Sequence, residues 1–225
     1  MSECCEVPEL LAAAWAVWPI ELDGASVVGG VGSGRLRGML IAVAHNLSSL
    51  HNVGAIFRTA DGAGFEHVIL SGYTGAPPDP RIAKVALGAE EVLGHEQVPD
   101  LPALLKRLDG VHVLLLEQHA SSVLPTELVS LPRDRDVALV ACDELYGAPA
   151  ELLARADTVL ELPMRGAKQS LNVSIAFGIA AYAVAHAVEP LDLATLRSRQ
   201  AARPVRDGVL TRGRTQGEVP TRRQR

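Results

Sequence analysis

The sequence predicts an α/β fold, in which a parallel sheet carries helices on both of its faces. Short apolar runs alternate with segments of helical periodicity from about residue 39 to residue 187. Apolar residues make up 48% of the 225 residues, and the glycines are scattered rather than repeated. Alternating strands and helices are typical of a parallel sheet covered on both sides. A chain of this length can bury roughly 70% of its unfolded surface, enough for one domain with extensions.

Five apolar runs are the predicted strands: 39–43, 68–70, 111–115, 137–141 and 158–162. The first helix follows from Val53, Ile56, Phe57 and Ala60, which recur at the spacing of one helix face. Shorter helices are predicted around 82–87 and 101–108. A last helix is predicted over about 173–187, with an apolar face made by Ile175, Ile179, Tyr182, Ala183 and His186.

Ligands bind beyond the carboxyl ends of the strands in such sheets, which directs attention to the loops 45–53, 141–148 and 163–171. In the first loop Asn52 stands where a helix N-cap is expected, so a capped helix with an exposed Arg58 is one interpretation. In the second, Asp143 and Glu144 form either a polar site or a helix start favoured by the helix dipole.

The third loop carries two basic residues before the start of a helix. Arg165 and Lys168 precede Ser170 and Asn172, either of which can cap that helix. Cationic side chains beside a helix N-terminus also form an anion site, to which backbone amides can contribute.

Together these loops resemble the three motifs of the SpoU (TrmH-like) family of SPOUT RNA methyltransferases. The first is similar to N-x-G-A-x-x-R-T-A at 52–60, and the third to I-P-M-x-G-x-x-x-S-L-N-V-S at 162–174. Between them, 84–90 looks like the K-x-x-x-G-A-E segment of the family. The resemblance covers about residues 38–187.

The second motif departs from the family pattern G-N-E-x-x-G. Cys142 replaces the first glycine and Asp143 replaces the asparagine, whereas Glu144 and Gly147 match. A thiol can narrow an adenosine pocket, and the added carboxylate places a negative charge near a cationic cofactor. Cofactor affinity is therefore the property that this departure affects most.

The resemblance implies a C-terminal trefoil knot, which general topology rules do not predict. It also implies S-adenosylmethionine as cofactor and transfer of a methyl group to a ribose 2′-hydroxyl of tRNA or rRNA. The matching cofactor positions are Cys142, Leu162, Met164 and Leu171. The matching catalytic positions are Arg58, Asn52, Glu144, Ser170 and Asn172. No metal is implied, and family members are homodimers whose substrate site spans the dimer interface. Because arginine keeps its proton at neutral pH, Arg58 is expected to orient the hydroxyl and stabilise negative charge.

Charge and composition divide the chain into three parts, predicted as an N-terminal extension (1–36), the methyltransferase domain (37–188) and a basic tail (189–225). The segment from residue 190 onward contains nine arginines and three acidic residues, which gives it a net charge of +6, whereas residues 1–189 carry a net charge of −11. Such a tail is predicted to be disordered and either contacts RNA phosphates or merely aids solubility.

The remaining features favour a cytoplasmic protein with no membrane segment. The three cysteines have neither a disulfide framework nor metal-ligand spacing. The apolar run 10–20 is too short to span a membrane, and the residues before it are acidic, unlike a signal peptide.

Three alternatives stay open at this level. One is an RNA-binding protein of this family that has lost its cofactor, and another is a methyltransferase that modifies a base instead of the ribose. The third is a small-molecule enzyme that uses the glycine-rich stretch 29–34, although that stretch does not have the G-x-G-x-x-G spacing.

Overall fold

The computed structural model of the protein describes residues 38–143, 145–190 and 192–201. Several sequence predictions lie outside these residues. They concern the apolar run 10–20, the glycine-rich stretch 29–34, Glu144 and the tail after residue 201.

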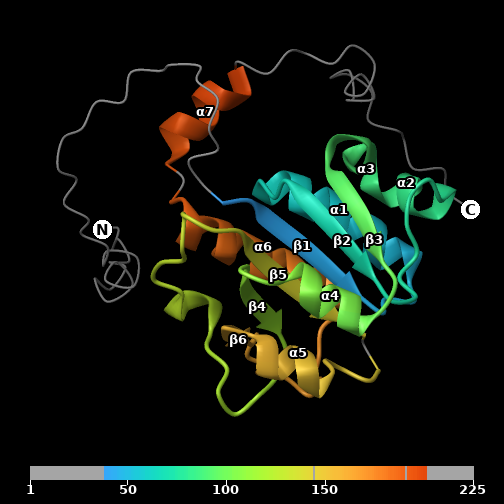
Figure 1. The fold of residues 1–225 in the computed structure, drawn as a ribbon. Coiled ribbons are helices and arrows are strands. Elements are labelled where there is room, and N and C mark those ends of the chain that lie inside the picture. Colours follow the sequence, from blue (N-terminus) through green and yellow to red (C-terminus); the bar gives the residue numbers. More distant parts are fainter. Residues whose placement is uncertain (1–37, 144, 191, 202–225) are drawn as a thin grey trace, which may run out of the picture. The chain divides into compact units, whose positions relative to one another are not determined.

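Within the described residues, six strands form one sheet in the order β3-β2-β1-β5-β4-β6, and each neighbouring pair is parallel (Figure 1). The strands are β1 (Leu40–His45), β2 (His67–Ser71), β3 (Gly94–Val98), β4 (His112–Leu116), β5 (Val137–Cys142) and β6 (Thr158–Leu160). The helices are α1 (Leu50–Ala63), α2 (Pro80–Ala86), α3 (Ala89–Val92), α4 (Leu101–Arg107), α5 (Ala150–Arg155), α6 (Val173–Val188) and α7 (Leu193–Ala201), with a 3₁₀ turn η2 (Pro125–Glu127).

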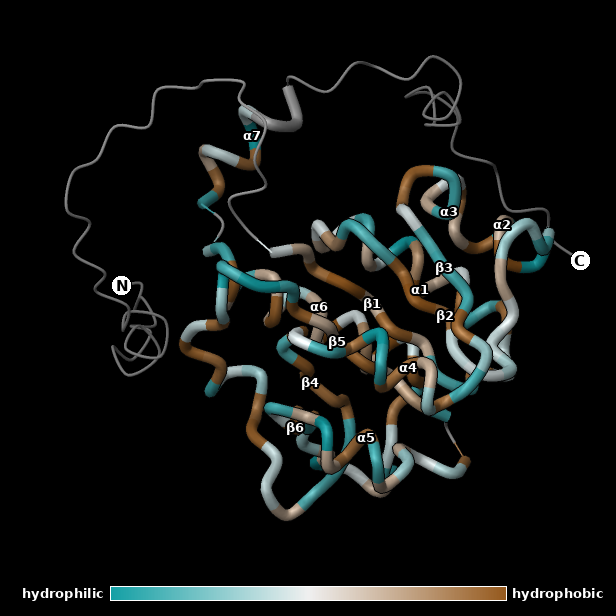
Figure 2. Tube along the Cα trace, in the orientation of Figure 1, coloured by the Kyte–Doolittle hydropathy of each residue, from teal (hydrophilic) through white to brown (hydrophobic). Residues whose placement is uncertain are grey.

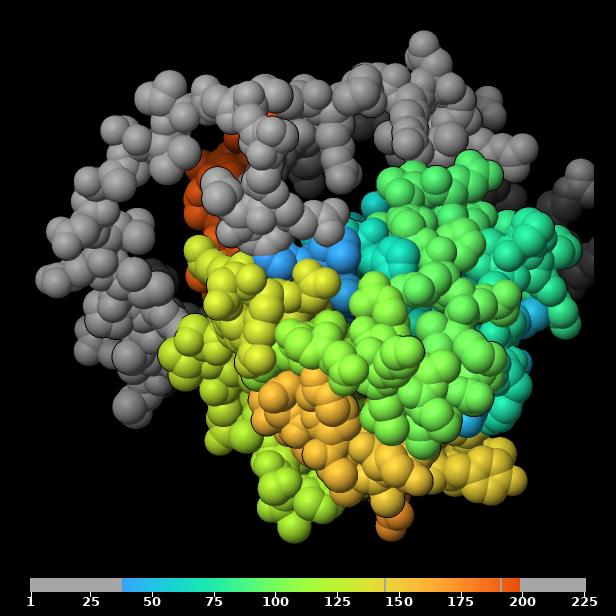
Figure 3. Space-filling model, viewed as in Figure 1, coloured from blue at the N-terminus to red at the C-terminus, as the bar shows by residue number. Residues whose placement is uncertain are grey.

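The two central strands, β1 and β5, are buried along their whole length. Successive side chains of a strand point to opposite faces, so β1 contributes to two separate cores. Leu40, Ala42 and Ala44 pack in the core that α1 and α6 cover, and Ile41 and Val43 pack in the core that α4 and α5 cover. The central strands are brown in Figure 2, and Figure 3 shows the face covered by α4 and α5. The predicted parallel sheet with helices on both faces is confirmed.

Elements that the sequence analysis missed are short or polar. The edge strand β3 reads Gly-His-Glu-Gln-Val, and only Val98 is buried. Helices α3 and α5 have four and six residues, too few to repeat an apolar face. The sheet therefore has six strands instead of the five predicted.

The start of α1 corrects one sequence expectation. Ser49, not Asn52, is the N-cap, and its side chain accepts a hydrogen bond from the backbone N–H of Asn52 at 3.4 Å. Asn52 lies in the first turn of the helix, where its side chain is buried. Its amide is therefore turned toward the protein interior, which places it for a role other than capping.

Helix α6 is present over the predicted span, but most of its predicted apolar face lies outside the core. Ile175, Ile179 and Tyr182 are exposed to 56%, 49% and 56%. The buried face is made instead by Phe177 together with alanines and valines. Both faces are apolar, so periodicity alone does not distinguish them.

The connection between β4 and β5 (117–136) contacts two elements that come later in the chain. The backbone of Val123 pairs with Val159 and Glu161, with N···O distances of 2.9 and 3.0 Å. Further along, Leu131 donates to the carbonyl oxygen of Ala187 at 3.1 Å. This connection thus lies against both β6 and the end of α6. The trefoil knot stays a prediction.

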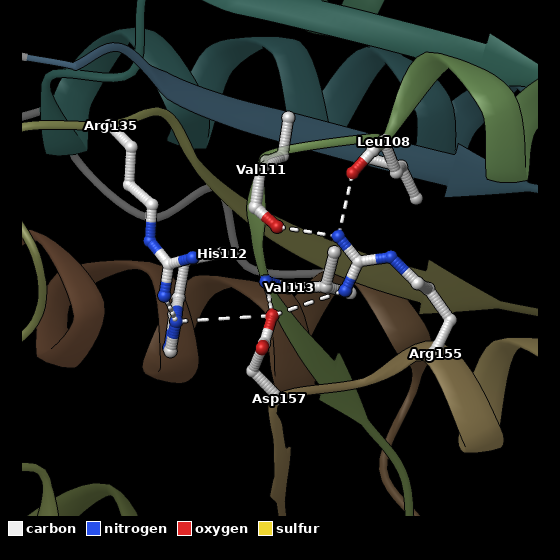
Figure 4. A network of polar contacts seen from close by, with 7 residues as sticks. All are labelled: Leu108, Val111, His112, Val113, Arg135, Arg155 and Asp157. Atoms are coloured by element: carbon white, nitrogen blue, oxygen red, sulfur yellow. Dashed lines mark hydrogen bonds and ion pairs between the residues drawn. The ribbon is translucent and has the colours of Figure 1, made fainter.

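A polar network holds the amino ends of β4 and β6 together (Figure 4). Arg155, the last residue of α5, donates to two carbonyl oxygens in the turn before β4, at 2.6 and 2.7 Å, and pairs with Asp157 at 3.2 Å. Asp157 also accepts from the N–H of Val113 at 2.8 Å. Burial lowers the pKa of the neighbouring His112. This network lies at the opposite end of the strands from the three loops and serves the fold.

Helix α7 occupies the first part of the segment predicted to be disordered, so that expectation is wrong for residues 193–201. The segment has a low apolar content, but arginine, leucine and alanine are good helix formers, which composition-based disorder arguments overlook. In the described part of the chain, no helix is long and apolar enough to cross a membrane.

Candidate active site

A cavity of about 440 Å³ opens at the carboxyl ends of β4, β5 and β6, beside the start of α6. We call it the strand-end cavity. It is lined by Leu116, Glu117, Gln118, Cys142, Asp143, Gly147, Leu160, Glu161, Leu162, Met164, Ser170, Leu171, Asn172, Val173 and Ala176. All four predicted cofactor residues are among them, together with Ser170 and Asn172. Loops far apart in the sequence meet here because parallel strands end at one edge of the sheet.

Asn172 connects the third loop with the first. Its Oδ1 accepts from the N–H of Ser174 at 2.9 Å, which makes Asn172 the N-cap of α6. Its Nδ2 donates to Oδ1 of Asn52 at 3.1 Å. A single amide thus caps one helix and binds the first turn of another, which fixes α1 and α6 relative to each other at the mouth of the cavity.

Gly54 allows the start of α1 to pack directly against α2. A Cβ at this position would lie 2.6 Å from the carbonyl oxygen of Ile82 and 2.9 Å from Cβ of Val85, both on α2. Only glycine removes this clash, so packing of α1 against α2 accounts for the glycine in the first motif.

The second loop is folded around one carboxylate. Oδ1 of Asp143 accepts from the backbone N–H groups of Leu145 and Tyr146, at 2.7 and 2.8 Å. The main chain closes on itself because Gly147, in a left-handed conformation (φ 68°), donates to the carbonyl oxygen of Asp143 at 3.1 Å. A Cβ on Gly147 would lie 2.9 Å from Oε2 of Glu117. Glu144 of this loop lies outside the described residues.

Three carboxylates border the cavity, and we call Glu117, Asp143 and Glu161 the rim carboxylates. Glu117 accepts from the N–H of Ala148 at 2.9 Å, and Glu161 accepts from the hydroxyl of Ser122 at 2.5 Å. Glu117 and Glu161 were missed from the sequence. The signal that could have found them is their position directly after β4 and β6.

Cys142 is an uncharged part of the cavity wall. Burial, with smaller contributions from Glu117 and Asp143, raises the pKa of its thiol to about 12. The side chain is 6% exposed. At neutral pH it therefore behaves as a small hydrophobic group among the leucines of the cavity.

Arg58 is exposed on α1, and the strand-end cavity is not lined by it. Among the described residues it forms no hydrogen bond or ion pair. Its guanidinium is thus available to a group from outside this chain. The structure therefore brings Asn52, Ser170, Asn172 and the four cofactor positions together, and leaves Arg58 apart from them.

Residues 39–182 match the SpoU rRNA Methylase family, and this match covers more than half of the chain. The chain belongs to that family. Among curated relatives, the 23S rRNA (guanosine-2′-O-)-methyltransferase RlmB of Haemophilus ducreyi is 29% identical over 145 residues. That alignment covers 64% of this chain and 58% of the relative, so the chain spans little more than half of the relative's length.

Two crystal structures of similar proteins have the same fold. The AdoMet-bound rRNA methyltransferase from Sinorhizobium meliloti is 27% identical with a TM-score of 0.60, over 67% of this chain and 56% of that one. The TrmH/SpoU tRNA modifying enzyme of A. aeolicus is 27% identical with a TM-score of 0.57, over 68% and 78%. The loops 45–53, 141–148 and 163–171 all lie within the region that the family match covers.

Proposed function

We propose that this SpoU family member is an S-adenosylmethionine-dependent RNA methyltransferase that acts on a ribose 2′-hydroxyl. The observation that carries the proposal is the strand-end cavity, because the family's third motif and the end of β5 both line it. The relatives named above are methyltransferases of rRNA or modifying enzymes of tRNA, and one of the solved structures contains AdoMet.

The residues present fit this cofactor. The volume of about 440 Å³ lies within the range of about 300–1,000 Å³ that is usual for small-molecule sites. Leucine, valine and methionine side chains offer an apolar wall for an adenine ring. The rim carboxylates place negative charge where a cationic sulfonium would be attracted. When bound, S-adenosylmethionine supplies a methyl group on a positively charged sulfur.

We infer that Cys142, Leu162, Met164 and Leu171 hold the cofactor and that the Asn52–Asn172 pair positions the first and third loops around it. Ser170, at the mouth of the cavity, and Glu144 are proposed to contact the ribose or the cofactor. Positioning supplies a large part of the rate in such transfers, because both reactants are held in one orientation.

Arg58 is proposed to act on the ribose from a second copy of the chain. The exposed residues Ile175, Ile179 and Tyr182 form an apolar stripe on α6. The stripe begins next to Ala176, which lines the cavity, and ends at Tyr182, whose hydroxyl lies beside Gly62 of α1. A stripe of this kind is typical of a subunit interface. Under two-fold symmetry the same stripe serves both copies, which lets α1 of one copy approach the cavity of the other. Arg58 then orients the 2′-hydroxyl and its adjoining phosphate through charged hydrogen bonds.

Two measurements on the full chain test this function. Calorimetry measures binding of S-adenosylmethionine by wild type and by a Cys142→Gly, Asp143→Asn double variant. Incubation of unmethylated rRNA and tRNA with radiolabelled S-adenosylmethionine then shows whether label enters linkages that resist alkali, as 2′-O-methylated linkages do. We expect wild type to bind the cofactor and to form resistant linkages.

Other outcomes distinguish the alternatives. Label in alkali-sensitive nucleotides would indicate base methylation. If only the double variant bound the cofactor, the wild-type chain would be an RNA-binding member of the family without cofactor. The division into an extension (1–36), this domain (37–188) and a basic tail (189–225) is part of the proposal, with the tail as a contact for RNA phosphates.

A further inference from the structure

Two exposed tyrosines from different loops lie around the Asp143 carboxylate. Tyr73 follows β2 and is 59% exposed, and Tyr146 follows β5 and is 87% exposed. The hydroxyl of Tyr73 donates to Oδ2 of Asp143, while the backbone N–H of Tyr146 donates to Oδ1. Asp143 lines the strand-end cavity, so both tyrosines contact a residue of the cavity wall. We call Tyr73 and Tyr146 the tyrosine platform.

Several residues hold Tyr73 in this place. Asn46, in a left-handed conformation (φ 58°), accepts from the N–H of Tyr73 through Oδ1 at 3.3 Å. Its Nδ2 donates to Nε2 of the buried His45 at 3.2 Å, which leaves Nδ1 of His45 to donate to Oγ of Ser71 at 3.0 Å. A Cβ at Gly72 would lie 1.9 Å from Oδ1 of Asn46. These contacts hold the backbone of Tyr73 against the end of β1.

The chemistry of the pair favours an uncharged aromatic ligand. The hydrogen bond to Asp143 raises the pKa of Tyr73 to about 12, so its ring stays neutral and its polar end is already bonded. What remains available on both tyrosines is the apolar ring. The rim carboxylates repel phosphate from this part of the surface. An unpaired nucleobase satisfies these conditions, because such bases stack on tyrosine without requiring charge.

We propose that Tyr73 and Tyr146 form an aromatic platform on which an unpaired base of the RNA substrate stacks, next to the ribose that receives the methyl group. This inference rests on the proposed function, since it names residues that select the substrate of the same site. It assigns the tyrosines to RNA recognition and leaves cofactor binding to the cavity, whose lining does not include either ring.

The test uses the full-length chain and a synthetic RNA hairpin with 2-aminopurine in its loop, whose fluorescence is quenched by stacking. A second hairpin carries 2-aminopurine in the paired stem. The variants are Tyr73→Ala, Tyr146→Ala, Tyr146→Phe and, as a matched surface truncation, Val129→Ala, where the side chain is 74% exposed and outside the cavity lining. Calorimetry measures the affinity of each variant for S-adenosylmethionine.

We expect each alanine variant to bind the loop hairpin about 5- to 150-fold more weakly and to quench its fluorescence less, which is the usual effect of losing one base-stacking contact. Tyr146→Phe keeps a ring and should keep both the quenching and most of the affinity. Val129→Ala should match wild type, and the stem hairpin should show no quenching by any variant. Affinity for S-adenosylmethionine should not change in Tyr146→Ala, because Tyr146 contacts Asp143 through its backbone N–H alone.

Wild-type binding without quenching of the loop hairpin would overturn the inference, and so would alanine variants that quench as wild type does. An equal loss in Tyr146→Phe would also overturn it, because the ring would then not be the part that matters. Failure of the proposed function gives a different result, namely no binding of S-adenosylmethionine and no methylation by wild type. The quenching experiment does not require catalysis, so the two outcomes are separable.

Discussion

Two glycines of α1 should respond in opposite directions to the same substitution. Gly54 is buried against α2, where an added Cβ would lie 2.6 Å from a backbone carbonyl oxygen of Ile82. Gly62 is exposed near the other end of the helix, where the nearest atom to an added Cβ is the hydroxyl oxygen of Tyr182 at 3.1 Å. Backbone of a packed helix cannot move aside easily, whereas the tip of a half-exposed tyrosine can.

The expected magnitudes follow from two effects. Replacing a mid-helix glycine by alanine stabilises a helix by about 0.5–1 kcal/mol. Gly62 lies in the last turn of α1, so this gain is an upper limit there. At Gly54 it is opposed by overpacking, which costs about 1–3 kcal/mol in a well-packed interior. We therefore expect Gly54→Ala to lower the free energy of unfolding by up to about 2.5 kcal/mol and Gly62→Ala to raise it by up to about 1 kcal/mol.

Urea unfolding of the full-length chain, followed by circular dichroism, measures both changes at one protein concentration. The slope of the unfolding free energy against urea should be the same in wild type and both variants, so that the midpoints report stability. Equal midpoints for the two variants, or a higher midpoint for Gly54→Ala, would refute the argument that contact with α2 requires glycine at that position.

Three further predictions concern the site. Because the pKa of Cys142 is raised to about 12, its thiol should react with iodoacetamide at pH 8 far more slowly than a free cysteine. The measurement uses a variant in which both N-terminal cysteines are replaced by serine, and unfolding in urea should restore the reaction. If Arg58 acts on the cavity of a second copy, an equal mixture of the Arg58→Ala variant and the cavity-filling Ala176→Phe variant should recover about a quarter of wild-type methylation, because half of the dimers are mixed and each has one intact site. Recovery of none would mean that both groups must come from one chain. Burial lowers the pKa of His45 below 6.5, so its contribution to stability is present above pH 6.5 and is lost as the pH falls below that value. The free energy of unfolding of wild type should therefore drop more steeply below pH 6.5 than that of His45→Gln, and parallel curves would contradict a buried, neutral histidine.

The strands and longer helices could be predicted because their signals are local. The residues of β1 and β5 form unbroken apolar runs, and α1 repeats apolar residues at helical spacing. Errors occurred where the local signal was ambiguous. Ser49 and Asn52 are both good caps, and only the chain geometry selects Ser49. Both faces of α6 are apolar, so only packing shows that Ile175 and Ile179 lie outside the core. The polar edge strand β3 is held by its pairing with β2, which leaves little trace in its composition.

The sequence by itself determined the fold class, the family motifs and the residues that line the strand-end cavity on the β5 and α6 sides. Only the tertiary structure decided which carboxylates border that cavity, that Asn172 binds Asn52, and that Tyr73 joins Asp143 from a loop 70 residues away. The periodicity of apolar residues predicts how one segment packs, and motif spacing predicts the residues of a single loop. The meeting of these side chains depends instead on the order of the strands, which places β1 between β2 and β5 and brings their carboxyl ends to one edge of the sheet.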